Sequence, residues 1–258
     1  MGVWPPSSQW RDDFIAGSPL HRVLAGAFGA LRSETGWPSP EGLSRDLAER
    51  TQGIVFVEDL ATQSRRPRAR SVADLYDVRI AERGEVPTRR ESWHDLLNAL
   101  VWASFPRAKR ALSARQARLH RARLGETFVR LPSARLPEQD CLSLLDEGGV
   151  ILSVESALEA EVAEALAAAD TARLEARCRE GRVAPWLFGH ALHEHLVADL
   201  RDARAGVHVV CCAHRLDAVD AAMAARLADP TQFLTRPTLQ GVRLATLEAW
   251  ARPEAAGP

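Results

Sequence analysis

The sequence predicts a helix-dominated α+β fold, a single globular domain whose strands form small antiparallel pairs or hairpins. Several segments place apolar residues at helical spacing, whereas the strand-like runs are few and short. Strands do not alternate regularly with helices, as they would in a doubly wound parallel fold. The 258 residues, 46% of them hydrophobic, suffice for one substantial core. We expect an irregular arm over 1–18, the domain over 19–250 and a flexible tail over 251–258.

Apolar periodicity predicts the helices, and proline and glycine mark where several begin or end. Pro40 and Pro185 stand at first helical positions, and Pro106 separates two consecutive helices. Gly181 ends a helix rich in alanine and glutamate. The predicted helices are 19–33, 39–50, 91–104, 106–124, 155–180, 185–203 and 215–228.

Short apolar runs predict the strands. Residues 141–145 and 150–154 flank Asp146-Glu147-Gly148-Gly149, whose glycine pair supplies the positive φ of a tight turn, so we expect a hairpin there. The arginine-rich segment 62–71 is polar and predicted to be a loop. The other predicted strands are 53–57, 76–80 and 207–212.

Charge and cysteine content exclude several classes of protein. The net charge of −1 provides no global attraction to nucleic acid or membrane. No run reaches the ~18 apolar residues of a membrane span, and the N-terminus does not resemble a signal peptide. We therefore expect a cytoplasmic protein without a membrane partner. The cysteines do not have zinc-type spacing and are expected to be buried thiols: Cys141, Cys178, Cys211 and Cys212.

One predicted helix carries a polar face typical of a pocket wall. On a helix over 91–104, Glu91, His94, Asp95, Asn98 and Trp102 fall within about a 100° arc, opposite the leucines. Histidine, aspartate and asparagine are poor helix formers, so a solvated face would favour other residues. The arc therefore indicates a binding or catalytic site.

A second polar face is predicted on the helix that begins at Pro185. Here His190, His193 and Glu194 share an arc with Trp186 and Arg201. The spacing matches neither H-E-x-x-H nor H-x-x-E-H, the arrangements found in zinc peptidases.

If the two arcs face each other, they form a mixed nitrogen and oxygen site. His94, Asp95, His190 and Glu194 are then the candidate ligands of zinc, manganese or iron. Such an ion would lower the pKa of a bound water and create a nucleophile, with a carboxylate as base. The alternative is a hydrogen-bonded polar network between helices without a metal.

The helix after Pro106 is strongly basic and begins beside the first polar arc. Lys109 is the only lysine in the chain and is a candidate anion contact, although its survival by chance on a solvated face is an equal alternative. Arginines at a helix N-terminus attract phosphate or carboxylate, and nucleic-acid binding is the broader interpretation. A solvated basic face is the alternative to both. The basic residues are Arg107, Lys109, Arg110, Arg115, Arg118, Arg121 and Arg123.

Several familiar motifs are absent. The chain has no Walker loop, no G-x-G-x-x-G fingerprint and no G-x-S-x-G elbow. Their absence counts against P-loop nucleotide hydrolysis, dinucleotide redox chemistry and ordinary serine esterase action.

Several short blocks of residues occur in a distinctive order along the chain: Tyr76, 84–89, Trp93-His94-Asp95, Asn98-Ala99-Leu100, Trp102, Phe105-Pro106, Lys109, Asp140, Asp146-Glu147, Gly149, 188–192 and Glu194. Taken together and in this order, they resemble the bacterial family called domain of unknown function 3025. The resemblance spans roughly 50–200 and fades after residue 200. It implies a soluble bacterial protein and groups Lys109, His94, Asp95, Asn98, His190 and Glu194 as one set, without implying an activity.

The sequence favours a metal-assisted hydrolase of a small anionic substrate. In this hypothesis His94, Asp95, Asn98 and Glu194 carry the catalysis, while Arg89, Trp102 and Lys109 bind the substrate. The alternative is a non-catalytic protein that contacts nucleic acid or an acidic partner through the arginine-rich helix.

Overall fold

A four-stranded sheet with helices on both faces forms the centre of the computed structural model. The strand order is β6-β5-β7-β8. The strands are β5 (Gly149–Val154), β6 (Val183–Leu187), β7 (Arg204–Cys211) and β8 (Val242–Arg243). The structure describes residues 9–32, 36–59, 70–128, 130–132, 134–234 and 241–251.

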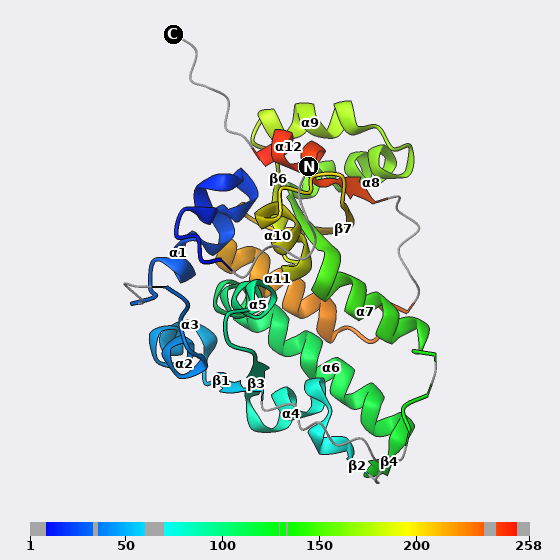
Figure 1. Ribbon diagram of the computed structural model, residues 1–258. Coiled ribbons are helices and arrows are strands. Elements are labelled where there is room, and N and C mark those ends of the chain that lie inside the picture. The colour runs from blue at the N-terminus through cyan, green and yellow to red at the C-terminus, as the bar shows by residue number, and fades with distance from the viewer. Residues whose placement is uncertain are drawn as a thin grey trace.

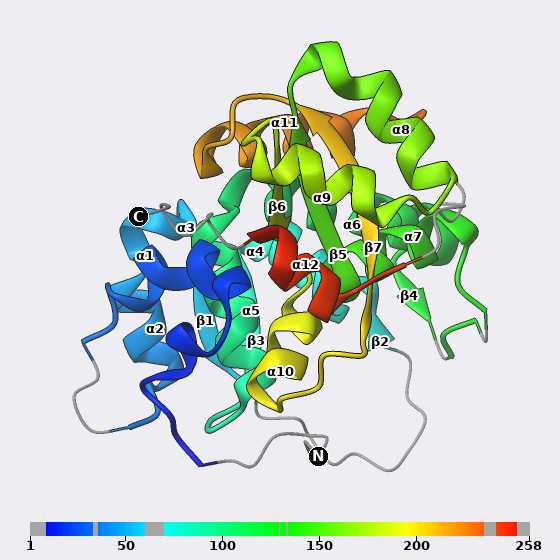
Figure 2. The ribbon, with the colours of Figure 1, turned by 90° about the horizontal axis from the view of Figure 1, so that it is seen from above.

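β5 is buried along its whole length because both of its faces are covered. Val150, Leu152 and Val154 point into one apolar cluster, and Ile151 points into the other, as the period of two requires. The first cluster is shared with α8 (Glu159–Ala167), α9 (Thr171–Arg179), α10 (His190–Val197) and α12 (Leu244–Ala251). The second is shared with α5 (Trp93–Ser104), α6 (Pro106–Leu124) and α11 (Leu216–Ala228). Seen from above, α8, α9 and α12 lie over the sheet (Figure 2).

Smaller elements complete the fold around α5 and α6, which run through its middle (Figure 1). Two further strand pairs are β1 with β3, which is parallel, and β2 with β4, which is antiparallel. The remaining elements are η1 (Phe14–Gly17), η2 (Pro19–Leu24), α1 (Ala25–Phe28), α2 (Pro40–Asp46), α3 (Ala48–Thr51), β1 (Val55–Glu58), β2 (Arg70–Ser71), η3 (Val72–Asp74), α4 (Tyr76–Arg83), β3 (Glu85–Thr88), β4 (Thr127–Phe128), α7 (Pro137–Gly148) and η4 (Ser156–Leu158).

Helices α6 and α7 lie side by side and antiparallel, and their contacts fix the position of the end of α7. Lys109 near the start of α6 meets Asp146 near the end of α7, whereas Gln116 further along α6 meets Ser143. The first N–H groups of α6 are capped by Asp220 of α11, which accepts hydrogen bonds from the backbone of Arg107 and Ala108 at 3.1 and 2.8 Å.

The helix-dominated α+β class is confirmed, and several predicted elements are wrong. The hairpin over 141–154 is the end of α7 followed directly by β5, because Gly149 is extended and continues into the strand. The strand over 76–80 is helix α4, whose buried Val78 and Ile80 also fit a strand period and whose end is marked by left-handed Gly84. Short apolar runs do not distinguish the two states.

Two long predicted helices are interrupted. The segment 155–180 contains η4, α8 and α9, with a break at Ala169, which has a positive φ of 53°. Pro185 lies in β6 instead of beginning a helix, and α10 begins only at His190. Two pairings are parallel, β1 with β3 and β5 with β7, and not antiparallel as expected.

No helix in the described ranges combines the length and the hydropathy needed to cross a bilayer. The expected N-terminal arm is described only from residue 9, where η1 and the preceding turn are found. The expected tail, apart from Ala251 at the end of α12, lies outside the described residues.

Candidate functional site

A pocket of about 290 Å³ lies where the beginning of α5, the end of α7 and the beginning of α10 meet. We call it the histidine pocket. Its walls come from segments that are far apart in the sequence, and four carboxylates face a single arginine. The lining residues are Asp59, Tyr76, Pro87, Arg89, His94, Asp95, Asn98, Asp146, Glu147 and His190.

Local sequence places the two histidines in the first turns of their helices. Ser92 caps α5 by accepting a hydrogen bond from the Asp95 backbone, so His94 is the second residue of that helix. Gly189 allows α10 to begin against the end of α7. A Cβ atom at Gly189 would lie 2.5 Å from the Glu147 carbonyl oxygen and 2.6 Å from the Gly149 nitrogen. Only glycine therefore allows His190 to approach α7 this closely.

Each of the two imidazoles is oriented through its Nδ1 atom. Nδ1 of His94 lies 3.0 Å from Oε2 of Glu194, and Nδ1 of His190 lies 2.9 Å from the backbone oxygen of Asp146. The two Nε2 atoms then point at each other across 3.1 Å. A carboxylate or carbonyl behind a histidine is the arrangement that orients metal-binding imidazoles in proteins.

The hydrogen bonds of this pair require one proton beyond two neutral rings. Both Nδ1 atoms must donate, because Glu194 and the Asp146 carbonyl only accept. Two neutral rings would then oppose their Nε2 lone pairs, so a third proton or another cation must lie between them. The pKa values agree with this requirement. The hydrogen bond to Glu194 raises the pKa of His94, whereas burial lowers the pKa of His190 to about 3.

Glu147 is the third group at this point. Its Oε2 atom lies 3.3 Å from Nε2 of His190, and single ligand atoms of His94, His190 and Glu147 all lie within 4.8 Å of one another. Burial, and then the charge of Asp146, raises the pKa of Glu147. Two imidazole nitrogens and a carboxylate with converging atoms are a donor set that zinc, manganese and iron accept.

A chain of hydrogen bonds behind the histidine pocket begins at the only lysine. Lys109 is 1% exposed and pairs with Asp146, while its ammonium donates to Oδ1 of Asn98 at 2.9 Å. This donation fixes the orientation of the Asn98 amide, which then donates from Nδ2 to the Tyr76 hydroxyl at 2.9 Å. Within the described part of the chain nothing accepts the Tyr76 proton, which is left to point into the pocket.

Burial and neighbouring charges determine the ionisation states of Asp146 and Tyr76 in this chain of hydrogen bonds. Burial opposes ionisation of Asp146, but Lys109 and the nearby imidazoles outweigh it and hold its pKa below the usual range. Burial of the Tyr76 hydroxyl, and then the charge of Asp146, raises the Tyr76 pKa well above its ordinary value. Tyr76 is therefore a neutral hydrogen-bond donor at physiological pH.

The structure brings His94, His190 and Glu194 together, because α5 and α10 pack against each other. Asp95 lines the same pocket, but both of its oxygens are held by Arg89 at 2.9 and 3.0 Å. Glu194 reaches the back of His94 and not the point where the two Nε2 atoms meet.

Of the three residues predicted to bind substrate, Arg89 lines the histidine pocket, whereas Trp102 and Lys109 lie behind it. Trp102 is completely buried and cannot contact a substrate. The Lys109 ammonium lies over its ring, 5.3 Å from the ring centroid. Lys109 itself is buried by its partners. Arg89 lines the pocket and is available there, although it is paired with Asp95. His193 faces away, since its Nε2 atom lies 3.1 Å from the Leu187 carbonyl oxygen.

Glu147, Asp146 and Tyr76 are absent from the set of site residues predicted from the sequence. Glu147 and Asp146 stand in what looks like a turn, where acidic residues commonly bond to the backbone. Tyr76 stands in what looks like a strand. The only signal for all three is their presence in the blocks that resemble the family. Helical periodicity relates residues within one helix, so it cannot predict that these residues lie near His94, which is on a different element.

Two arginines of the basic helix are held by carboxylates of the fold. Arg115 is 2% exposed and binds Glu138 and the carbonyl oxygens of Leu227 and Asp229, so it anchors the end of α11. Arg121 pairs with Glu82 and Glu126. These two arginines are therefore already engaged and add little to the surface that the nucleic-acid hypothesis requires.

Comparison with known proteins places the chain in a family. A family model described as "Protein of unknown function (DUF3025)" matches residues 59–256. The match includes every residue of the histidine pocket and continues well past residue 200, where the resemblance read from the sequence fades. No curated protein and no solved structure matches this chain. Because the model covers most of its length, the chain belongs to the family DUF3025.

Proposed function

We propose that this protein is a metal-dependent hydrolase whose ion is held by Nε2 of His94, Nε2 of His190 and the carboxylate of Glu147. One observation carries the proposal. Both imidazoles are oriented through Nδ1 by an acceptor, and their Nε2 atoms and a Glu147 oxygen converge on one point. An additional positive charge is needed there, and a divalent ion provides it.

The electrostatics of the histidine pocket favour a cation as its first occupant. Asp59, Asp95, Asp146 and Glu147 line it, and Arg89 is the only basic group among the lining residues other than the histidines. Glu194 and Lys109 add one charge of each sign just behind the wall. An anionic substrate would be repelled from this pocket unless a metal ion were already bound.

A divalent ion held by His94, His190 and Glu147 would supply a bound water that is activated as a nucleophile near neutral pH. Hydrolysis would join the oxygen of this water to an electrophilic carbon or phosphorus of the substrate. The leaving group would depart with the electron pair of the broken bond and take a proton from water. Tyr76 donates its phenolic hydrogen to the oxygen on which negative charge develops. Its donor direction is set by Asn98 and, through Asn98, by Lys109.

The remaining residues have supporting roles in this proposal. Glu194 orients His94 and raises its basicity. Asp95 holds Arg89 at the mouth, where the guanidinium can meet a substrate oxygen. A small anionic substrate remains the class we propose, since the bound ion reverses the local charge.

The test is the metal content of purified protein, measured by elemental analysis with no chelating tag. We compare the wild type with His94→Ala and Glu147→Gln. His195→Ala is the matched control, because His195 also lies on α10, hydrogen-bonds to the backbone oxygen of Ala191 and does not line the histidine pocket. Circular dichroism is used to check that each variant is folded.

We expect about one zinc, manganese or iron ion per chain in the wild type and in His195→Ala. Both site variants should lose it, and the loss should abolish any hydrolysis detected with ester, amide or phosphate-ester substrates. The proposal fails if the wild type binds none of the three ions when they are supplied, or if both site variants retain full metal content.

A further inference from the structure

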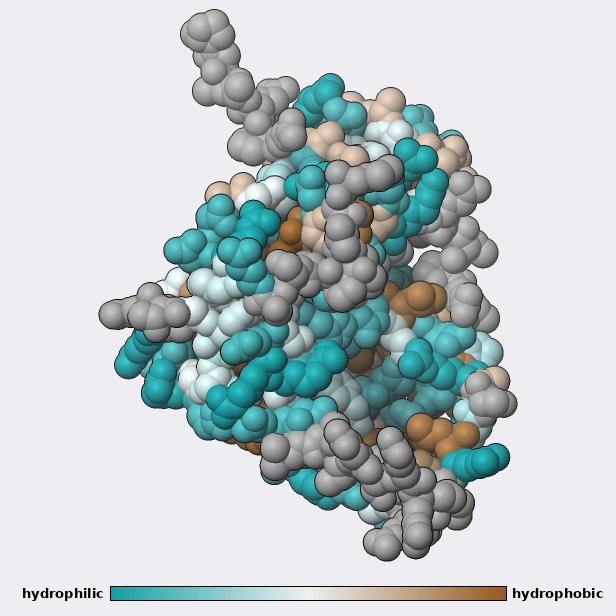
Figure 3. Space-filling model, in the orientation of Figure 1, coloured by the Kyte–Doolittle hydropathy of each residue, from teal (hydrophilic) through white to brown (hydrophobic). Residues whose placement is uncertain are grey.

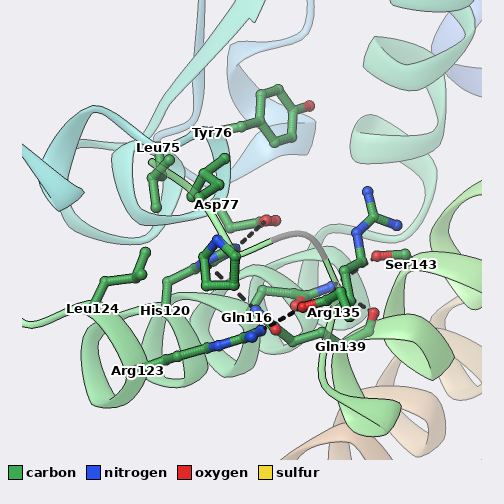
Figure 4. Close-up of a pocket in the computed structure, with 13 residues that line it drawn as sticks. Leu75, Tyr76, Asp77, Gln116, His120, Arg123, Leu124, Arg135, Gln139 and Ser143 are labelled. Atoms are coloured by element: carbon green, nitrogen blue, oxygen red, sulfur yellow. Dashed lines mark hydrogen bonds and ion pairs between the residues drawn. The ribbon is translucent and has the colours of Figure 1, made fainter. Parts of the chain in front are cut away.

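A second pocket, of about 350 Å³, lies between α4, α6, α7 and the segment that leads into α7. We call it the arginine pocket. Figure 4 shows Gln116, Gln139 and Ser143 across from Tyr76 and Asp77. Arg123 and Arg135 also line this pocket. Its wall is partly apolar and partly polar, and the hydrolysis proposed above places no part of the substrate in it.

The charge of the arginine pocket is opposite to that of the histidine pocket. Arg123 donates to the Ala134 carbonyl oxygen at 2.8 Å and has no acidic partner among the described residues. Arg135 has no hydrogen-bond or ionic partner in the same ranges. The one carboxylate of the lining, Asp77, lies 3.8 Å from Nε2 of His120. Two guanidinium groups therefore remain for an anion.

A buried polar group in the same wall also lacks a partner. Gln116 is 4% exposed, and its Nε2 donates to the Gln139 carbonyl oxygen at 3.3 Å and to Ser143 at 3.2 Å. Its Oε1 atom accepts nothing from the described residues. The donation to a carbonyl fixes which end of the amide is the oxygen. An unmet acceptor in a polar wall is a feature that bound molecules satisfy.

Exposed apolar side chains surround this pocket. Tyr76 and Leu131 line it, and they are two of the few large apolar residues that the described ranges leave more than 36% exposed. Figure 3 shows hydrophobic surface over α7 and near the far end of α6, on a face that is otherwise largely hydrophilic. The occupant therefore has an apolar part as well as an anionic group.

The two pockets share walls. Tyr76 lines both, and Figure 4 shows its hydroxyl pointing away from the other residues of the arginine pocket. This hydroxyl accepts the hydrogen bond from Asn98. Helix α7 contributes Ser143 to the arginine pocket and Asp146 to the histidine pocket. On α6, Lys109 lies behind the histidine pocket and Gln116 lines the arginine pocket. Seven residues at 1.5 Å each separate these two on one helix face by about 10 Å, a span that a single small molecule can cover.

We propose that the arginine pocket binds the anionic, partly apolar end of the substrate, while the reacting group lies in the histidine pocket. This proposal depends on the hydrolase proposed above and specifies its substrate class. The substrate is an elongated molecule with a phosphate, sulfate or carboxylate group at one end, held by Arg123 and Arg135. Its apolar middle lies against Tyr76 and Leu131.

The test uses 1-naphthyl phosphate as the probe, with 1-naphthol as its uncharged match. Binding to the full chain is followed by fluorescence titration in the presence of a chelator, so that a metal ion cannot hold the phosphate. The variants are Arg123→Gln, Arg135→Gln and their double variant. Arg118→Gln is the control, because Arg118 is an exposed arginine of the same helix that lines neither pocket. His94→Ala tests whether the histidine pocket contributes.

We expect saturable binding of the phosphate probe to the wild type, to Arg118→Gln and to His94→Ala with the same affinity. Each pocket variant should weaken it at least fivefold, and 1-naphthol should bind more weakly than the phosphate. Unchanged affinity in the double variant, or no saturable binding to the wild type, overturns the proposal. If the probe binds as expected but the metal analysis fails, the hydrolase proposal fails while the anion pocket stands.

Discussion

The Nε2 atoms of His94 and His190 lie 3.1 Å apart while both Nδ1 atoms face acceptors, so a proton and the metal ion proposed above would compete for the same position. His94 binds an additional proton more readily than His190 does, because Glu194 raises the pKa of His94 and burial lowers the pKa of His190. This competition has a measurable consequence.

Metal affinity should fall as the pH falls. The raised pKa of His94 means that the ring is protonated below its folded pKa, which lies above the ordinary value of about 6.5. Metal binding must then release that proton, so the apparent affinity for zinc should drop about tenfold for each pH unit below the folded pKa. Competition with a fluorescent chelator from pH 8 to pH 5.5 measures the slope. A flat profile would show that His94 is not a ligand.

Glu194→Gln should weaken metal binding without removing it. The substitution keeps a hydrogen-bond acceptor at Nδ1 of His94 but removes the charge that raises its basicity. Loss of such an outer partner typically lowers metal affinity by about 10- to 100-fold. Asp95→Asn is the matched control, because this neighbouring carboxylate binds Arg89 and touches neither histidine. Equal effects of the two substitutions would contradict the role assigned to Glu194.

Gly189→Ala should destabilise the protein and loosen the site. The new methyl group would lie 2.5 Å from the Glu147 carbonyl oxygen, so the beginning of α10 must move away from α7. We expect a loss of about 1–3 kcal/mol in the free energy of unfolding, together with weaker metal binding. At Gly206, where a Cβ would meet its nearest neighbour at 3.8 Å, the same substitution should change stability far less. Denaturant unfolding compares the two variants.

Lys109→Met should be strongly destabilising, because it leaves the Asp146 carboxylate buried without its cation. Breaking a buried pair on one side typically costs about 3–5 kcal/mol. Adding Asp146→Asn should recover a large part of that loss, whereas Arg118→Met on the exposed face should have little effect. If the double variant is no more stable than Lys109→Met, the pairing of Lys109 with Asp146 is not what the lysine contributes.

Stability should also decrease in mild acid. Burial lowers the pKa of His190 to about 3 and that of His208 to about 4, and it moves the pKa of His193 well below its ordinary value. The unfolded chain takes up these protons near pH 6.5 and the folded chain does not. Each such group therefore removes up to about 1.4 kcal/mol per pH unit below that value. His94, with its raised pKa, opposes them only in part.

Unfolding free energies at pH 7.5 and pH 5.5 test this expectation. His208→Leu should reduce the difference between the two pH values, because His208 lies away from the histidine pocket, against Phe233. A difference that is unchanged in His208→Leu would mean that His208 does not take part.

Local patterns in the sequence were enough to predict part of the fold and part of the site. The helix-dominated class, the long helix after Pro106 and the polar face of α5 follow from periodicity and from proline, which act within a few residues. His94 and His190 were identifiable because histidine on a helix face next to acidic residues has few purely local explanations. The family could be recognised because its blocks lie in order along the chain.

Only the tertiary structure decided which of these residues meet. Glu147 becomes a candidate ligand because Gly189 lets α10 approach the end of α7, a contact across more than 40 residues. Lys109, which looks like an anion contact in the sequence, is buried by Asp146 of another helix. The state of 76–80 and 141–148 was also decided by packing, since short apolar runs suit both a helix and a strand. Periodicity describes one element at a time, whereas a site is made where several elements converge.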